Sequence, residues 1–287
     1  MADGNPWDGL TVEEHEFQFN PQAAFPGFAD VRARLAPLND AARATLGQPE
    51  EVAYGDGPLH RLDIFRAAGD GPRPVHVFYH GGYWRAQDKA NYAFLAGVLV
   101  PLGITTVIAN YDLCPAVTLD EVTASAVAGF GWVADHVEEI GGDAERITLS
   151  GHSAGAHLGA AILADAGLAE KPAGLRGAVL TSGIFDPRPA IGTSVNAELG
   201  LTEEIAARND MQARPPRRRA EICLMAGTRE PVHWVAQTWR YYEMLRREGH
   251  EPLLHLLAGH DHFDILEDYL RPDGLTLDVI LRQSGLR

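Results

Sequence analysis

The sequence has little cysteine and few basic residues, and it lacks any long apolar run. Only two cysteines occur among its 287 residues, Cys114 and Cys223, and they form no spacing motif. A disulfide-stabilised scaffold would need more of them. We therefore expect a protein of a reducing compartment, the cytoplasm.

The charge balance and the missing apolar runs also limit the partners. Lys and Arg number 24 against 39 Asp and Glu, for a formal net charge of −15. This balance disfavours nucleic acid and anionic membranes as partners. No stretch approaches the roughly 20 apolar residues of a membrane-spanning helix, and residues 1–19 lack the apolar run of a secretory signal. A small-molecule partner is expected, and it can be anionic because salt screens distant charges beyond about 10 Å.

What is present is a regular alternation of short apolar segments with segments of helical periodicity. The expected strands are residues 51–54, 59–65, 75–79, 104–110, 146–149, 175–180, 222–226 and 252–257. The expected helices are residues 92–99, 119–140, 154–168 and 232–247, with a final helix that begins within 263–270. This alternation predicts a mostly parallel central sheet with helices on both faces, and a turn at residues 55–58 predicts an N-terminal antiparallel hairpin.

Two segments fall outside this alternation. Residues 1–50 place Val31, Leu35 and Leu38 at helical spacing, which predicts a helical extension lying on a main domain of residues 51–287. Residues 184–219 contain four prolines and no expected strand. Loops this long inside a compact domain are usually functional, so we expect a lid-like insertion.

The pentapeptide at residues 151–155 fits the pattern G-x-S-x-G, with Ser153 at its centre. An expected strand precedes it and an expected helix follows, which is the context of the nucleophile elbow of α/β-hydrolases. A glycine-rich turn with a capping serine is the structural alternative. The sequence therefore predicts the α/β-hydrolase fold with Ser153 as the catalytic nucleophile.

A serine nucleophile needs a base, and the base needs an acid that orients it. In this fold the order along the chain is serine, acid, histidine, and His260 and His262 follow the last expected strand. We favour His262 because it stands directly before the last expected helix, with His260 as its rival. The H-x-H pair could also indicate a metal, but no second ligand cluster accompanies it, and we expect no metal or cofactor.

The acid is expected on the loop after the strand at residues 222–226. Glu230 is the only carboxylate there, although Asp is more frequent in this role. Asp186, after the preceding strand, is the alternative. Asp264 is interpreted as a helix-start residue.

An oxyanion hole is expected where residues 80–84, His-Gly-Gly-Tyr-Trp, follow the third strand. Backbone N–H groups of Gly81 or Gly82 and of Ala154 would meet the developing negative charge. A purely structural turn is the alternative interpretation of this loop.

These motifs together resemble kynurenine formamidase (arylformamidase). The similarity rests on residues 80–84, on residues 111–115 (Tyr-Asp-Leu-Cys-Pro), on residues 151–158 and on residues 262–265. It implies hydrolysis of a small aromatic N-acyl substrate by Ser153 through an acyl-enzyme. Similar bacterial proteins hydrolyse N-acylated anthranilates, so the acyl group, formyl or acetyl, stays open.

The resemblance also implies a substrate site beside the oxyanion hole, and we assign it to His80, Tyr83, Trp84 and Arg85. The aromatic residues would contact the substrate ring, and Arg85 or Lys89 would pair with a carboxylate. A carboxylesterase for short-chain esters is the alternative function, and a non-catalytic binding protein of this fold is a further one. The oligomeric state is open, with a homodimer among the options.

Overall fold

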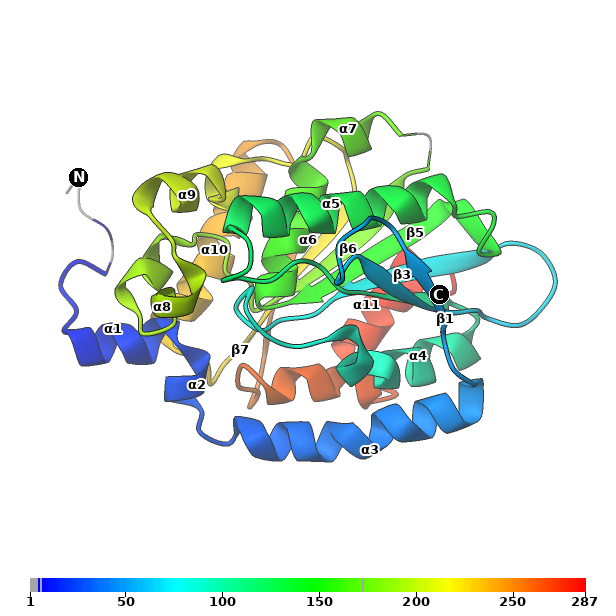
Figure 1. Cartoon of the computed structure of the whole chain (residues 1–287), viewed down its shortest axis with the longest axis horizontal. Coiled ribbons are helices and arrows are strands. Elements are labelled where there is room, and N and C mark those ends of the chain that lie inside the picture. The colour runs from blue at the N-terminus through cyan, green and yellow to red at the C-terminus, as the bar shows by residue number, and fades with distance from the viewer. Residues whose placement is uncertain (1–4, 6, 172) are drawn as a thin grey trace.

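In the computed structural model, which describes residues 5, 7–171 and 173–287, the chain folds around one eight-stranded sheet (Figure 1). Its strands are β1 (Glu50–Ala53), β2 (Arg61–Phe65), β3 (Arg73–Tyr79), β4 (Thr105–Ala109), β5 (Gly142–His152), β6 (Leu175–Thr181), β7 (Glu221–Gly227) and β8 (Leu253–Leu257). Their order across the sheet is β1-β2-β4-β3-β5-β6-β7-β8.

The sheet is antiparallel at one edge and parallel elsewhere. β1 pairs with β2, and β2 with β4, in antiparallel register, whereas all the pairs from β4-β3 across to β7-β8 are parallel. The predicted hairpin and the mostly parallel sheet are both confirmed. In a parallel sheet the carboxyl ends of the strands meet at one edge, and this is where such folds place their ligands.

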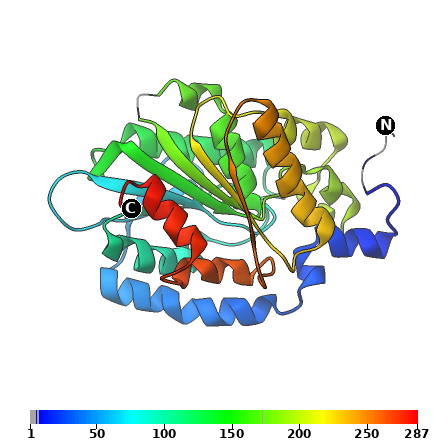
Figure 2. The same cartoon turned by 180° about the vertical axis from the view of Figure 1, so that it is seen from behind.

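Helices cover both faces of the sheet (Figures 1 and 2). One face packs against α5 (Leu119–Asp135), α6 (Ala154–Ala164) and α10 (Val232–Arg247), and the other against α4 (Ala93–Leu99) and α11 (Leu275–Gln283). Alternate residues of β3 serve the two faces: Val75 and Val77 lie in the first core, and Phe78 lies in the second. This period of two is what a strand buried on both faces requires.

The N-terminal extension is helical and lies against α4. It contains α1 (Val12–Phe19), α2 (Pro21–Ala24) and α3 (Phe28–Leu46), the long blue helix of Figure 1. Thr11 and Glu14 form a capping box that fixes the start of α1. On α3, Val31 and Leu35 are buried as their spacing predicts, whereas Leu38 is 38% exposed.

The segment of residues 184–219 consists of short helical pieces. These are η3 (Arg188–Gly192), α8 (Asn196–Leu199), α9 (Glu203–Arg208) and η4 (Met211–Ala213). The segment contacts the N-terminal extension, because the Ser194 hydroxyl and backbone N–H both donate to the Glu16 carboxylate. Two elements far apart in the sequence are thereby tied together.

One helix boundary differs from the prediction. Asp264–Leu270 forms a separate 3₁₀ helix, η5, instead of opening the final helix α11. Pro272 lacks a backbone N–H and its ring clashes with a preceding turn, so a helix cannot run through it. Among the helices of the described residues, none combines the length and the apolar content needed to cross a membrane.

Candidate active site

Ser153 stands at the sharp turn between β5 and α6. Its backbone has φ 57° and ψ −118°, a strained conformation for a residue with a side chain. The turn brings the helix backbone so close to β3 that a Cβ at Gly155 would lie 1.9 Å from the Tyr79 carbonyl oxygen. Only glycine fits there, which explains the small residues around Ser153.

His262 contacts both Ser153 and a carboxylate. Its Nε2 lies 3.0 Å from the Ser153 Oγ, and its Nδ1 lies 2.6 Å from Glu230 Oε1. All three side chains are buried. Since a carboxylate at Nδ1 holds the proton on that nitrogen, Nε2 is left as an acceptor for the serine hydroxyl.

The Glu230 carboxylate is itself held by two donors. The Ser182 hydroxyl and the Gly227 backbone N–H both lie 2.8 Å from Glu230 Oε2. The ring of Trp234 meets His262 edge-on at 4.8 Å, while its Nε1 donates to the Ser182 carbonyl at 3.0 Å. These contacts fix the carboxylate and the imidazole in one orientation.

His152, the residue before Ser153, also contacts His262. His152 Nε2 donates to the His262 backbone carbonyl at 2.7 Å. Burial, together with the nearby His262, holds the pKa of His152 well below its usual value. His152 is therefore neutral at physiological pH and adds no positive charge beside the imidazole of His262.

The alternative base and acid have other partners. His260 Nδ1 lies 3.2 Å from Asp264 Oδ1. Asp186 accepts from the Arg188 guanidinium at 2.7 Å. Within the described part of the chain, neither of these side chains is hydrogen-bonded to Ser153 or His262.

The expected oxyanion loop lies against the serine. Gly81, Gly82 and Ser153 line the same cavity. Gly82 has φ 115°, and a Cβ there would lie 2.1 Å from the Ala86 carbonyl oxygen, so the tight loop excludes any other residue. Ala154 is the first residue of α6, and its N–H has no acceptor within the helix.

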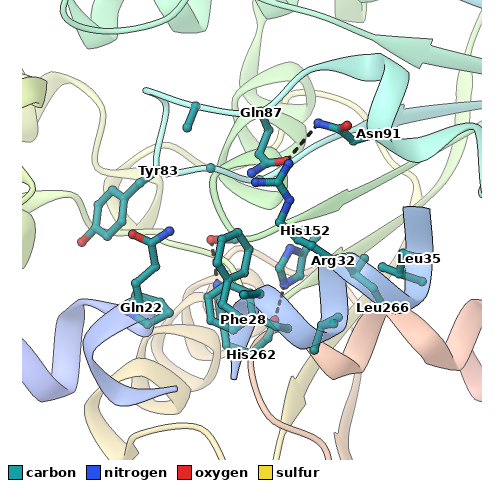
Figure 3. A pocket seen from close by; sticks show the side chains of 18 of the residues that line it. Gln22, Phe28, Arg32, Leu35, Tyr83, Gln87, Asn91, His152, His262 and Leu266 are labelled. Carbon is teal, nitrogen blue, oxygen red and sulfur yellow. Dashed lines mark hydrogen bonds between the residues drawn. The ribbon is translucent and has the colours of Figure 1, made fainter. Parts of the chain in front are cut away.

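The cavity has a volume of about 450 Å³, and its lining joins the serine to the N-terminal extension. Figure 3 shows α3 carrying Phe28, Arg32 and Leu35 beside His152 and His262. Across the cavity stands the segment that follows the oxyanion loop, with side chains from residues 83–92. The insertion of residues 184–219 contributes no residue to this lining among the part of the chain described.

Two expected substrate-binding residues are instead part of the core. Trp84 is fully buried and packs edge-on against His157 at 5.0 Å. His80 is 1% exposed, stacks on Tyr111 and contacts the Gly81 carbonyl at 2.7 Å. Neither lines the cavity. Their expected contact with the substrate is therefore wrong, and both side chains instead support the oxyanion loop from within the core.

The expected cations are already paired. Tyr83 and Arg85 do line the cavity, but Arg85 forms an ion pair of 2.5 Å with Glu198. Lys89 is buried between Asp63 at 2.6 Å and Glu51 at 2.7 Å. A buried lysine needs such partners, and Lys89 is thereby unavailable to a substrate.

Sequence reasoning missed the residues that α3 and the segment after the oxyanion loop bring to the cavity, among them Phe28, Arg32 and Gln87. The helical spacing of α3 gave no signal that it lies over the serine. Among the described residues, no group of three or more His, Cys, Asp or Glu side chains is placed to hold a metal ion.

A parallel sheet flanked by helices, with a strained serine at a strand-to-helix turn, is the arrangement of an α/β-hydrolase. A family model described as alpha/beta hydrolase fold matches residues 76–264. A crystal structure from Silicibacter sp., of a protein proposed to be a thioesterase, is 27% identical with a TM-score of 0.82, covering 95% of this chain and 99% of that one.

Relatives of known function identify the family within the α/β-hydrolases. Kynurenine formamidase of Danio rerio is 29% identical over 97% of this chain and 98% of its own length. Kynurenine formamidase of Drosophila melanogaster is 30% identical over 76% of each chain. The chain belongs to the kynurenine formamidase family of α/β-hydrolases.

Proposed function

We propose that this protein hydrolyses N-formylkynurenine, an aryl formamide, to kynurenine and formate. The observation that carries the proposal is the hydrogen-bonded series Glu230–His262–Ser153 opening into a cavity of about 450 Å³ in a chain of this family. A cavity of this size suits a single small aromatic substrate.

The first step is attack of the Ser153 oxygen on the formyl carbon. His262 Nε2, 3.0 Å away, takes the hydroxyl proton, and Glu230 stabilises the imidazolium that forms. The carbonyl oxygen becomes an oxyanion near the N–H groups of Gly81 or Gly82 and of Ala154. Each such donor lowers the barrier by about 2.7–4 kcal/mol.

The second step breaks the carbon–nitrogen bond. The imidazolium of His262 gives its proton to the departing aryl amine, and the formyl group stays on Ser153 as an ester. Water then attacks this ester with His262 as the base, so that formate leaves and the serine regains its proton. Neither step is an oxidation or a reduction.

The cavity lining supports an aromatic substrate. Phe28 and Phe263 lie 4.6 Å apart between ring centroids, and Tyr83 and Tyr92 line the same space. Aromatic pairs add about 0.5–1.5 kcal/mol beyond the area they bury. These rings favour a planar aryl group over an alkyl amide.

We also propose a cytoplasmic location. Both cysteines are buried free thiols, and burial raises the pKa of Cys114 to about 11 and that of Cys223 to about 12. Such thiols stay protonated at neutral pH and react slowly. Unpaired cysteines fit a reducing compartment, and cell fractionation with an antibody to the protein tests this location.

The function is tested by one series of substrates under one set of conditions. It contains formyl, acetyl, butyryl and octanoyl derivatives of kynurenine, of anthranilate and of p-nitrophenol. We expect the highest kcat/KM for the formyl arylamines and a fall as the acyl chain lengthens. Rising efficiency with chain length, or turnover of the phenyl esters alone, would instead identify a carboxylesterase.

A further inference from the structure

The cavity contains one cation whose charge is not offset by an acidic side chain of the described residues. Of the two arginines that line it, Arg85 is paired with Glu198. No ion pair joins Arg32 to a carboxylate in the part of the chain that the structure describes. Arg32 is an exposed residue that also lines the cavity, so its guanidinium is accessible to an anionic group of a ligand bound there.

The position of Arg32 is set by its neighbours on α3. Its guanidinium carbon lies 5.6 Å from the centre of the Phe28 ring, a cation–π distance that holds the side chain over the cavity. In Figure 3 the side chain of Arg32 extends from α3 toward the side on which Gln87 and Asn91 stand. Its charge also acts on Tyr92, where it opposes the rise in pKa that burial causes.

Gln87 stands on the same cavity with a strained backbone. Its φ is 82°, a region that residues with side chains rarely occupy and that is often found at ligand sites. Asn91 Nδ2 donates to Gln87 Oε1 at 3.2 Å. This bond fixes the orientation of the amide and leaves the Gln87 NH₂ group as a donor toward the cavity.

We propose that Arg32 and Gln87 bind the carboxylate of the substrate and make this enzyme selective for aryl formamides that carry one. The inference rests on the proposed function and names its substrate class. A planar guanidinium with one amide donor matches the two oxygens of a carboxylate. The rings of Phe28, which lies beside Arg32, and of Phe263 line the same cavity and would contact the aryl group.

The decisive measurement is binding and needs no turnover. In a Ser153→Ala background, calorimetry compares kynurenine with 2-aminoacetophenone, which keeps the aryl ketone but lacks the whole amino-acid group, both its carboxylate and its ammonium. We expect kynurenine to bind more tightly. Adding Arg32→Gln should raise the Kd of kynurenine about tenfold to a hundredfold, the usual range for a lost charged hydrogen bond, and should leave 2-aminoacetophenone within about twofold.

Two further variants test the geometry. Gln87→Glu places a negative charge beside the bound carboxylate and should weaken kynurenine alone. Arg34→Gln is the matched control, because Arg34 lies on the same helix but pairs with Glu267 at 2.6 Å and does not line this cavity. It should leave both affinities unchanged.

Turnover measurements distinguish a failure of the carboxylate site from a failure of the proposed hydrolysis. With active enzyme, Arg32→Gln should raise KM for N-formylkynurenine with little change in kcat, and should leave 2-formamidoacetophenone unaffected. Equal affinity for kynurenine with and without the Arg32→Gln substitution would overturn the carboxylate site while formamide hydrolysis stood. A protein that binds kynurenine through Arg32 but hydrolyses neither formamide would retain the site and refute the reaction.

Discussion

At the scale of single residues, the proposed reaction depends on the hydrogen bond between Glu230 and the imidazole of His262. Replacing Glu230 with glutamine removes the negative charge and allows the wrong tautomer, so kcat should fall about 10³- to 10⁴-fold. The buried side chain keeps its shape, and the unfolding midpoint should change little. Asp186→Asn is the control, since Asp186 pairs with Arg188, and a larger loss of kcat in that variant would reassign the acid.

The two histidines of the H-x-H pair should differ strongly. His262→Ala removes the imidazole that is hydrogen-bonded to both Ser153 and Glu230, and kcat should fall by about 10⁴-fold or more. His260→Ala should cost less than about tenfold, because His260 contacts Asp264. Single-turnover rates of both variants check this ranking, and the reverse order would make His260 the base.

Sequence reasoning predicted residues that lie together in the structure where residue type and chain order guided it. The G-x-S-x-G motif predicted Ser153, and the order serine–acid–histidine predicted Glu230 and His262; the structure brings these three side chains within hydrogen-bond distance of one another. The predicted contact of His80 and Trp84 with the substrate was wrong, because a position next to the oxyanion loop in the sequence does not determine where the side chain points. Trp84 has φ 55°, and the turn points its side chain into the core.

At the scale of elements, α3 is the part of the site that the sequence could not place. Its period of about 3.6 residues predicted a helix, but Phe28 and Arg32 reach a serine more than a hundred positions away only through tertiary packing. Another tertiary contact, between the segment after the oxyanion loop and the insertion, pairs Arg85 with Glu198. Contacts between distant segments leave no periodic signal in one sequence.

The docking of α3 should therefore affect both stability and substrate binding. Leu35→Ala removes a buried side chain that lines the cavity and should lower the free energy of unfolding by about 2 kcal/mol while raising KM for aryl substrates. Leu38→Ala on the same helix, where the side chain is 38% exposed, should have a smaller effect on both. Urea unfolding and steady-state kinetics measure the pair; equal effects would argue against α3 as part of the substrate site.

The insertion of residues 184–219 contains a carboxyl group whose titration affects stability. Burial, and then the nearby Asp186, raises the pKa of Asp210 from its ordinary 3.8 to about 6. Between those values the folded chain keeps a proton that the unfolded chain has released. The contribution of this group is therefore full below the unfolded pKa and is lost as pH rises through the folded pKa.

Asp210→Asn should flatten that part of the pH profile. The amide oxygen can still accept from the Gln212 N–H, as Asp210 Oδ1 does at 2.9 Å; the ion pair of Asp210 with Arg188 at 3.1 Å is lost, and position 210 no longer titrates. As pH rises from about 4 to about 6, the change in the thermal unfolding midpoint should be more positive for Asp210→Asn than for the wild type, because the loss of stability due to Asp210 is absent. Asp56→Asn, in the exposed hairpin turn, is the control, and an unchanged slope in Asp210→Asn would show that other groups set the profile.

At the scale of the whole molecule, the sheet predicted from alternating strands and helices places the carboxyl ends of β5, β7 and β8 at one edge. Ser153, Glu230 and His262 follow these strands, so the topology alone assembles the site. The fold class could be predicted from the sequence because strand periods and turn motifs are local. The cavity above the serine could not be predicted, because it forms between this sheet and α3, a helix outside the alternation of strands and helices.

The nucleophilic role of Ser153 is tested most directly by the rate at which kynurenine appears from N-formylkynurenine with wild-type enzyme and with Ser153→Ala. Only the reactive oxygen is lost in that variant, and its unfolding midpoint should match the wild type. We predict measurable turnover by the wild type and a fall of kcat by about 10⁴-fold or more in Ser153→Ala. Turnover by Ser153→Ala at the wild-type rate would contradict this role.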